Sequence, residues 1–165
     1  MEKKLIYNES ISGENYKIAI IKSRWNSDIT SRLYEGCISV LKEKNVKSEN
    51  ILEYEVPGSY ELPIAANIVV QQKNVDAIIC LGCIIKGETK HDMIIAQSVS
   101  DSILDLSKKY NIPVIFGVLT TESMDQAVER SGGKVGNKGT ESAYTALKMI
   151  HLFEQIKKPN SKNWV

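Results

Sequence analysis

The chain has 165 residues, of which 42% are apolar and 25% are charged, the composition of one ordinary globular domain. Its 21 lysines and arginines nearly balance its 20 aspartates and glutamates, which leaves a net charge of +1. This balance disfavours broad binding to nucleic acid or to acidic membranes, so any recognition of anions must be local.

Neither targeting nor membrane segments are predicted. The first ten residues, MEKKLIYNES, lack the apolar core of a signal peptide, and the longest apolar run, over 77–85, is far shorter than the roughly 20 residues of a membrane helix. Three cysteines make no disulfide framework. We therefore expect a cytoplasmic protein with an amino-terminal arm over 1–15, one domain over 16–156 and a polar tail over 157–165, with a helix stop at Pro159.

Between the two ends, buried apolar runs alternate with apolar stripes at helical spacing. The pattern predicts strands over 18–21, 51–56, 76–85 and 112–119, and helices through 29–41, 62–72, 93–106, 122–130 and about 140–156. Strands that are apolar on both faces indicate a parallel sheet with helices on both sides. Ligands bind such sheets beyond the carboxyl ends of the strands, so the residues that follow each strand are the candidate site.

The segments after the first two strands contain possible ligand-binding residues. Trp25 could stack on a flat heterocycle whose edge Asn26 could bind, although a tryptophan that packs the loop onto the core is the simpler interpretation. Ser59, Tyr60 and Glu61 could present amides and a carboxylate to a ligand. They could equally begin a helix, with Ser59 as N-cap and Glu61 favoured by the helix dipole.

The segment KGETKHD after the third strand begins at Lys86 and is the most informative. A glycine turn runs into a predicted helix, which leaves free N–H groups at Glu88 and Thr89 for a phosphate or a similar anion. Thr89 with Asp92 also resembles a capping box, a purely structural feature. His91 lies in the first turn at the ligand-binding edge, and histidine suits proton transfer at neutral pH.

The last part of the chain holds weaker signals. Phe116 lies inside the fourth strand and is typical of a core residue. Arg130 precedes the glycine-rich stretch SGGKVGNKG, which departs from the phosphate-loop pattern and follows a helix instead of a strand. We therefore expect a flexible connection between helices. Arg130 and Lys138 stay candidate anion ligands if the fold or a neighbouring chain brings them to the site.

Cys80 and Cys83 form a C-x-x-C pair within the third strand. Positions three apart on a strand face opposite sides of the sheet, so these thiols cannot share a metal or form a disulfide. The two histidines have no acidic cluster beside them. We expect buried free thiols and no metal site.

Five segments in order resemble the 6,7-dimethyl-8-ribityllumazine synthase family. They are RWN at 24–26, VPGSYELP at 56–63, LGCIIKGETKH at 81–91, PVIFGVLTT at 113–121 and GNKG at 136–139. The resemblance covers about residues 16–156 and implies a flavodoxin-like α/β/α protomer with a four-stranded parallel sheet. It implies condensation of 5-amino-6-(D-ribitylamino)uracil with 3,4-dihydroxy-2-butanone 4-phosphate, release of phosphate and water, and no cofactor. It also implies pentamers with active sites between subunits, and the short 132–139 segment is compatible with a sixty-subunit shell.

The same resemblance implies roles for individual residues. His91 would transfer protons, and Trp25 would stack on the pyrimidine. The remaining substrate contacts would come from Asn26, from Ser59, Tyr60 and Glu61 at the ribityl chain and ring edge, from Ile84 and Ile85 at the ring, from Lys86, and from Glu88 and Thr89 at the phosphate. A neighbouring subunit would add Arg130 at the phosphate and Phe116 and Lys138 at the pyrimidine.

One position departs from the family pattern. Many members carry an acidic residue two positions after the histidine, where this chain has Met93. Asp92 is no obvious substitute, because adjacent residues on a helix point about 100° apart. Two alternatives stay open: an archaeal-type riboflavin synthase, whose substrate has no phosphate to fill the anion site, and a non-catalytic shell-forming or ligand-binding paralogue, favoured only by Met93.

Overall fold

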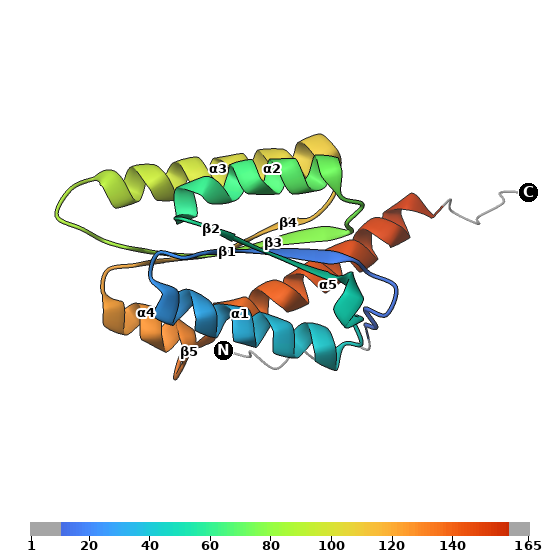
Figure 1. Cartoon of the computed structure of the whole chain (residues 1–165), viewed down its shortest axis with the longest axis horizontal. Helices are drawn as coiled ribbons and strands as arrows, with labels where there is room; N and C mark the ends of the chain where they lie inside the picture. Colours follow the sequence, from blue (N-terminus) through green and yellow to red (C-terminus); the bar gives the residue numbers. More distant parts are fainter. Residues whose placement is uncertain (1–10, 159–165) are drawn as a thin grey trace, which may run out of the picture.

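A computed structural model of the chain describes residues 11–158. Most of the expected amino-terminal arm and the tail from Pro159 onward lie outside the described residues. Figure 1 labels the main helices and strands, and the described residues also form two short 3₁₀ helices, η2 and η3. In chain order the elements are β1 Ile18–Ser23, α1 Ser27–Glu43, η2 Ser48–Asn50, β2 Ile51–Val56, η3 Ser59–Glu61, α2 Leu62–Gln72, β3 Ala77–Ile85, α3 His91–Tyr110, β4 Val114–Thr121, α4 Met124–Arg130, β5 Ser131–Gly133, β6 Gly136–Asn137 and α5 Lys138–Lys157.

The four longer strands form one parallel sheet in the order β2-β1-β3-β4. Helices α2 and α3 cover one face of this sheet, and α1, α4 and α5 cover the other (Figure 1). The predicted three-layer α/β/α fold with a four-stranded parallel sheet is thus confirmed. The chain passes from β1 to β2 on one side and then to β3 on the other, so the strand order reverses beside β1. In open α/β sheets such a switch point is where a crevice forms.

Each strand contributes alternate residues to two separate cores. Ile18 and Ile20 of β1 pack toward α1 and α5, whereas Ala19 and Ile21 pack toward α2 and α3. All four side chains are buried. The central strands are therefore apolar at consecutive positions, which is the pattern that predicts a strand covered on both faces.

Several element boundaries differ from the sequence-based expectation. Strand β4 runs to Thr121 instead of 119, because Thr120 and Thr121 pair with Ile84 and Ile85 of β3. Helix α4 begins at Met124 instead of 122, because the Ser123 side chain caps it by accepting from a backbone N–H.

The glycine-rich segment is an ordered structure, so the expectation of a flexible connection is wrong. Strands β5 and β6 form a small antiparallel hairpin in which Gly132 and Gly136 have φ values of 128° and 104°. Asn137 closes it by donating from Nδ2 to the carbonyls of Arg32 and Ser131, at 2.9 and 3.0 Å. The same side chain accepts from the N–H of Gly139 at 2.8 Å, which starts α5 earlier than predicted.

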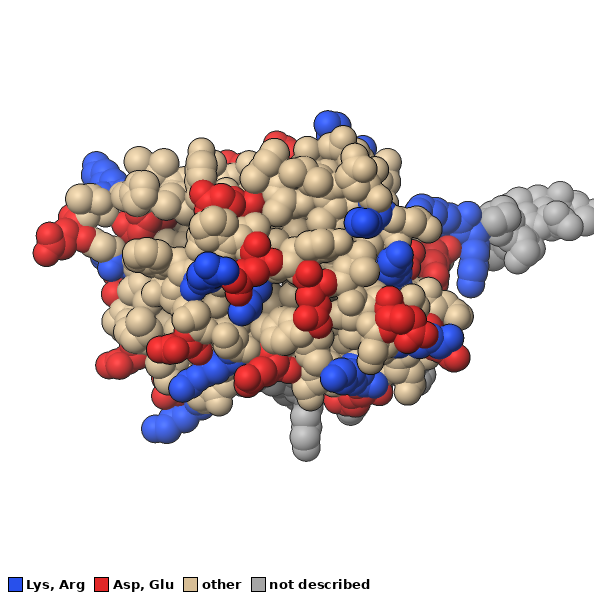
Figure 2. Space-filling view, viewed as in Figure 1, with Lys and Arg blue, Asp and Glu red and all other residues tan. Residues whose placement is uncertain are grey.

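The surface carries charges of both signs. Figure 2 shows basic and acidic side chains interspersed on the face drawn there, with no continuous basic stripe. Within residues 11–158, no helix has the length and apolar character needed to cross a lipid bilayer.

Gly139 marks the closest approach of α5 to α1, since a Cβ there would overlap the backbone oxygen of Leu33. We expect Gly139→Ala to destabilise the protein by about 1–3 kcal/mol, because the clash is with backbone and cannot be relieved by a side-chain rotation. Urea unfolding measures the change. Gly87→Ala is the control, because a Cβ there meets nothing within 4 Å and the expected change is within about 0.5 kcal/mol. Equal unfolding midpoints for the two variants would contradict the close approach.

Candidate active site

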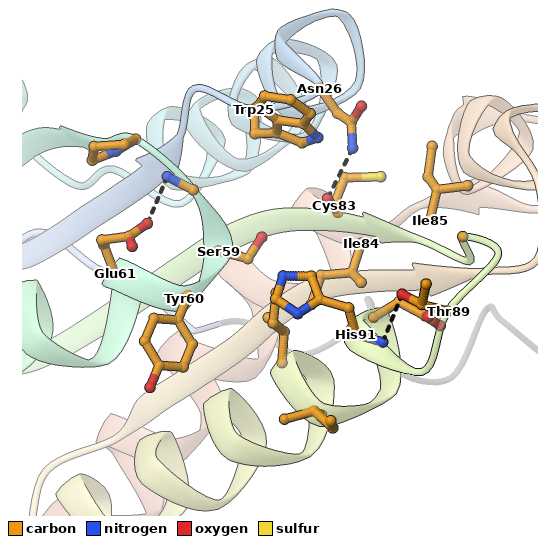
Figure 3. A pocket seen from close by; sticks show the side chains of 16 residues that line it. Trp25, Asn26, Ser59, Tyr60, Glu61, Cys83, Ile84, Ile85, Thr89 and His91 are labelled. Atoms are coloured by element: carbon orange, nitrogen blue, oxygen red, sulfur yellow. Dashed lines mark hydrogen bonds between the residues drawn. The ribbon is translucent and has the colours of Figure 1, made fainter.

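A cavity of about 810 Å³ opens at the carboxyl ends of β1, β2 and β3, beside the switch point of the sheet. Its volume suits a small organic ligand. Its walls come from three segments that are far apart in the sequence, within 25–26, 57–61 and 83–95, and Figure 3 shows how their side chains lie around it. The lining residues are Trp25, Asn26, Pro57, Gly58, Ser59, Tyr60, Glu61, Cys83, Ile84, Ile85, Gly87, Thr89, His91, Asp92, Ile94 and Ile95.

Most of the candidate residues from the sequence meet at this cavity. Those it brings together are Trp25, Asn26, Ser59, Tyr60, Glu61, Ile84, Ile85, Thr89 and His91. Those that do not line it are Lys86, Glu88, Phe116, Arg130 and Lys138. Sequence reasoning missed Cys83, Ile94 and Ile95, although spacing could have found them. Cys83 lies two residues before Ile85 on the same strand face, and Ile94 and Ile95 lie one helical turn after His91.

Trp25 forms an exposed wall of the cavity. Its side chain is 73% exposed, so packing of the loop onto the core is the wrong interpretation. The backbone holds it in place, because the N–H groups of Arg24 and Trp25 donate to the carbonyls of Val56 and Pro57 at 2.8 and 3.0 Å. An indole held by its backbone and exposed on its ring is available for stacking.

A charged cluster reinforces the same loop from the outside. The Arg24 guanidinium lies 2.7 Å from Glu55 Oε1, and Lys22 Nζ lies 3.1 Å from Glu55 Oε2. Hydrogen bonds from Arg24 and Lys22 lower the pKa of Glu55, which favours its charged form. These contacts join the end of β1 to its neighbour β2.

Asn26 ties the loop to the other neighbouring strand. Its backbone is left-handed, with φ 58° and ψ 46°, and its Nδ2 donates to the carbonyl of Cys83 at 3.0 Å. Asparagine tolerates this conformation better than most residues. One amide hydrogen of Asn26 is therefore already used within the protein, and the residue connects β1 to β3 beneath the cavity.

The segment after β2 turns through η3, and its cap differs from the prediction. Gly58, and not Ser59, is the N-cap, and its N–H donates to Glu61 Oε2 at 2.9 Å. Glu61 therefore has a structural contact as well as a place in the cavity wall. Ser59 is buried, and its hydroxyl has no hydrogen-bond partner among the described residues. A buried polar atom without a partner is unfavourable unless a ligand or water supplies one.

His91 is the first residue of α3, and its imidazole projects into the cavity across from the Trp25 indole (Figure 3). Its backbone N–H donates to Thr89 Oγ1 at 3.4 Å. The helix has no side-chain N-cap hydrogen bond, so the predicted capping box of Thr89 with Asp92 is not formed. The sequence predicts that Glu88 and Thr89 supply the free N–H groups at the start of this helix. The two residues lie before the helix instead, because α3 begins at His91.

Lys86 is directed to the end of β4 and not to the cavity. Its Nζ lies 2.6 Å from Glu122 Oε2, and its backbone N–H donates to the Thr121 carbonyl at 2.8 Å. The hydrogen bond to Glu122 raises the pKa of Lys86. This residue therefore anchors the loop that leads to His91.

Three candidate residues lie away from the chain's own cavity. Phe116 is half-buried in β4, against the core formed with α2 and α3. Arg130 and Lys138 both pair with Glu141 on the opposite side of the sheet. A single chain does not bring these three side chains to His91.

The three cysteines are free and buried, as the strand pattern predicts for Cys80 and Cys83. These two thiols enter opposite cores, so they cannot act as a pair. Burial raises the pKa of Cys80 to about 12 and that of Cys83 to about 11. In the part of the chain that the structure describes, no group of three or more histidine, cysteine or acidic side chains could hold a metal ion.

Comparison with known proteins gives a consistent result. The model of the 6,7-dimethyl-8-ribityllumazine synthase family matches residues 15–154. A protein of that name from Cytophaga hutchinsonii is 50% identical over 131 residues, which cover 79% of this chain and 82% of the relative. The protein of that name from Porphyromonas gingivalis is 47% identical over 146 residues, covering 88% and 91%. That from Bacteroides fragilis is 44% identical over 142 residues, covering 86% and 99%.

The raised pKa values predict slow thiol chemistry in the folded protein. At pH 8 a thiol with a pKa of about 11, as for Cys83, is only about 0.1% thiolate, against about a quarter for an ordinary cysteine. We expect an aromatic disulfide reagent to find no fast-reacting thiol in the native chain and all 3 cysteines after unfolding in urea. One native thiol that reacts at the rate of free cysteine would show that Cys83 is open to the cavity.

Proposed function

This chain belongs to the 6,7-dimethyl-8-ribityllumazine synthase family, and we propose that the cavity between Trp25 and His91 is where it performs the family's condensation. The substrates are 5-amino-6-(D-ribitylamino)uracil and 3,4-dihydroxy-2-butanone 4-phosphate. The observation that carries the assignment is an exposed indole facing an imidazole across one cavity at the switch point of the sheet.

The pyrimidine lies flat against the Trp25 indole. Ile84 and Ile85, at the end of β3, provide an apolar surface for the ring and line the same cavity. Ser59, Tyr60 and Glu61 hold the ring edge and the ribityl chain, whose hydroxyl groups are suitable partners for the unpaired Ser59 hydroxyl. A few polar groups in a mostly apolar cavity are the usual way to orient such a ligand.

The phosphate of the second substrate binds beside the amino terminus of α3. Amides of the loop at Glu88 and Thr89 donate to it, and the positive end of the helix dipole favours the anion there. Thr89 lines the cavity within two residues of His91, which supports a position of the butanone next to the imidazole.

The reaction requires proton transfers and orientation. The free amine of the pyrimidine attacks the butanone carbonyl, and loss of water gives an imine. Phosphate is then eliminated, the resulting enol rearranges, and the ribityl-bearing nitrogen closes the ring with loss of a second water. His91 donates and accepts the protons in these steps, and alignment of the two substrates supplies much of the remaining acceleration.

The active protein is a homo-oligomer, with pentamers as the basic unit and each cavity completed by a neighbouring subunit. Two observations support this proposal. Phe116, Arg130 and Lys138, which the family resemblance places at the substrates, lie outside the chain's own cavity, which supports their supply by a second copy. Large apolar side chains are also exposed along α2 and α3, namely Ile64, Ile68, Ile94 and Leu104. A surface of this kind is typical of a subunit interface. Analytical ultracentrifugation distinguishes pentamers from decamers and from a sixty-subunit shell.

Incubation of the protein with both substrates should release phosphate and form the lumazine, detected by its absorbance, faster than the uncatalysed reaction. His91→Ala should lower kcat by about 10²-fold, the usual contribution of a general acid or base. No rate above background with the unmodified protein would overturn the proposal. Riboflavin made from lumazine alone would instead indicate a riboflavin synthase.

Trp25→Ala should raise KM for the pyrimidine by roughly 5- to 150-fold, since stacking of a base on an aromatic ring is worth about 1–3 kcal/mol. Trp25→Phe keeps an aromatic face and should retain most of the affinity. Steady-state kinetics with each substrate varied in turn measures both values. An equal rise in KM for the butanone phosphate would argue against stacking as the role of this side chain.

A further inference from the structure

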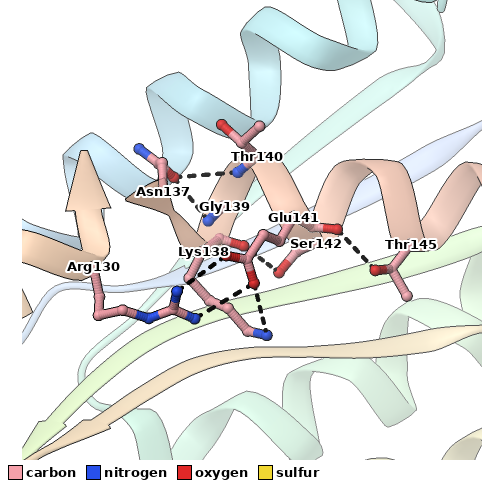
Figure 4. A network of polar contacts seen from close by, with 8 residues as sticks. All are labelled: Arg130, Asn137, Lys138, Gly139, Thr140, Glu141, Ser142 and Thr145. Atoms are coloured by element: carbon pink, nitrogen blue, oxygen red, sulfur yellow. Dashed lines mark hydrogen bonds and ion pairs between the residues drawn. The ribbon is translucent and has the colours of Figure 1, made fainter. Parts of the chain in front are cut away.

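A compact group of charges joins the end of α4 to the start of α5 (Figure 4). It consists of Arg130, Lys138 and Glu141, and we call it the Glu141 cluster. Arg130 Nη1 and Nη2 donate to Glu141 Oε1 and Oε2 at 3.1 and 3.4 Å, and Lys138 Nζ lies 3.4 Å from Oε2. The three side chains are 30%, 31% and 26% exposed, respectively, so the pairs are less open to water than ordinary surface ion pairs.

The backbone under the cluster is held firmly. Asn137 caps α5 by accepting from the N–H groups of Gly139 and Thr140 at 2.8 and 3.2 Å. Ser142 Oγ donates to the Lys138 carbonyl at 2.7 Å, and Thr145 Oγ1 donates to that of Glu141 at 2.8 Å. With the backbone fixed in this way, the orientation of the two cations depends mainly on the carboxylate between them.

The cluster has N–H donors left over that could bind a second anion. A guanidinium has five N–H donors and an ammonium has three, and the contacts with Glu141 use two and one of them. Two cations and one carboxylate leave a net charge of +1. A dianionic phosphate can therefore bind to the remaining donors without displacing Glu141.

We propose that Glu141 is a positioning residue that sets the affinity for the phosphate-bearing substrate by holding Arg130 and Lys138 in one orientation. This inference rests on the proposed function, in which those two cations reach the cavity of a neighbouring subunit. In the opposite role, the Glu141 carboxylate would compete with phosphate for the same donors. The two roles predict changes of opposite sign when the charge of Glu141 is removed.

Glu141→Gln tests whether removal of the charge weakens or strengthens binding of the phosphate-bearing substrate. We expect KM for the butanone phosphate and the inhibition constant of inorganic phosphate to rise about tenfold, because charge-assisted fork contacts orient the guanidinium, while kcat changes less than about threefold. The matched control is Glu129→Gln, which makes the same change of charge one residue before Arg130. Glu129 accepts from the Lys134 N–H at 2.7 Å and belongs to none of the contacts of the cluster. KM of the Glu129→Gln variant for the butanone phosphate should stay within about twofold of the parent value.

A second pair of variants separates positioning from general damage to the fold. Glu141→Asp keeps the charge but shortens the reach by one methylene, so KM for the phosphate substrate should rise to an intermediate value. In an Arg130→Ala background, Glu141→Gln should have little further effect, because residues that act through each other are not additive. Urea unfolding of each variant shows whether the protein remains folded.

Three results would overturn the inference. They are a fall in KM with Glu141→Gln, a change no larger than that of Glu129→Gln, and a full additional effect in the Arg130→Ala background. An inactive parent protein would be a failure of the proposed function instead, so the two failures can be told apart.

Discussion

The position of β1 between β2 and β3 is the constraint on which the site depends. It brings the ends of three strands side by side, and hydrogen bonds then join them directly. The Trp25 N–H binds the carbonyl of Pro57 on one side, and the Asn26 side chain binds that of Cys83 on the other. The loop that bears the indole is therefore attached to both neighbouring strands. The two apolar cores on either side of the sheet keep β1 central and so keep this arrangement in place.

In the proposed function, the chain divides its substrate-binding residues between two regions. An aromatic wall, a histidine and the loop before α3 meet at one cavity, whereas the cations of the Glu141 cluster lie on the other face of the sheet. The first region has the shape to bind a flat ring, and the second has the charge to bind a phosphate. Such a division makes assembly a condition of activity in the proposed function, since neither region is complete by itself.

The sequence predicts the fold well because the central strands are continuously apolar, as in Ile18 to Ile21. It also predicts most of the cavity wall, because strand ends in this fold class converge on one edge. It fails where a side chain has two possible partners. The direction of the Lys86 side chain depends on the position of Glu122. The N-cap of η3 depends on which backbone N–H the Glu61 carboxylate accepts from, and that group belongs to Gly58. The partner of such a side chain is set by tertiary contacts, so no local sequence pattern predicts it.

The unpaired hydroxyl of Ser59 has a consequence for how this cavity could change under selection. The oxygen is buried from water and has no hydrogen-bond partner among the described residues. The ligand-free protein is therefore less stable than it would be with an apolar residue at this position. Replacement by alanine would relieve that penalty in the free protein and, in the proposed function, would remove a contact to the ribityl chain of the bound substrate. Robustness of the fold and recognition of a polyhydroxylated chain therefore oppose each other at this one side chain.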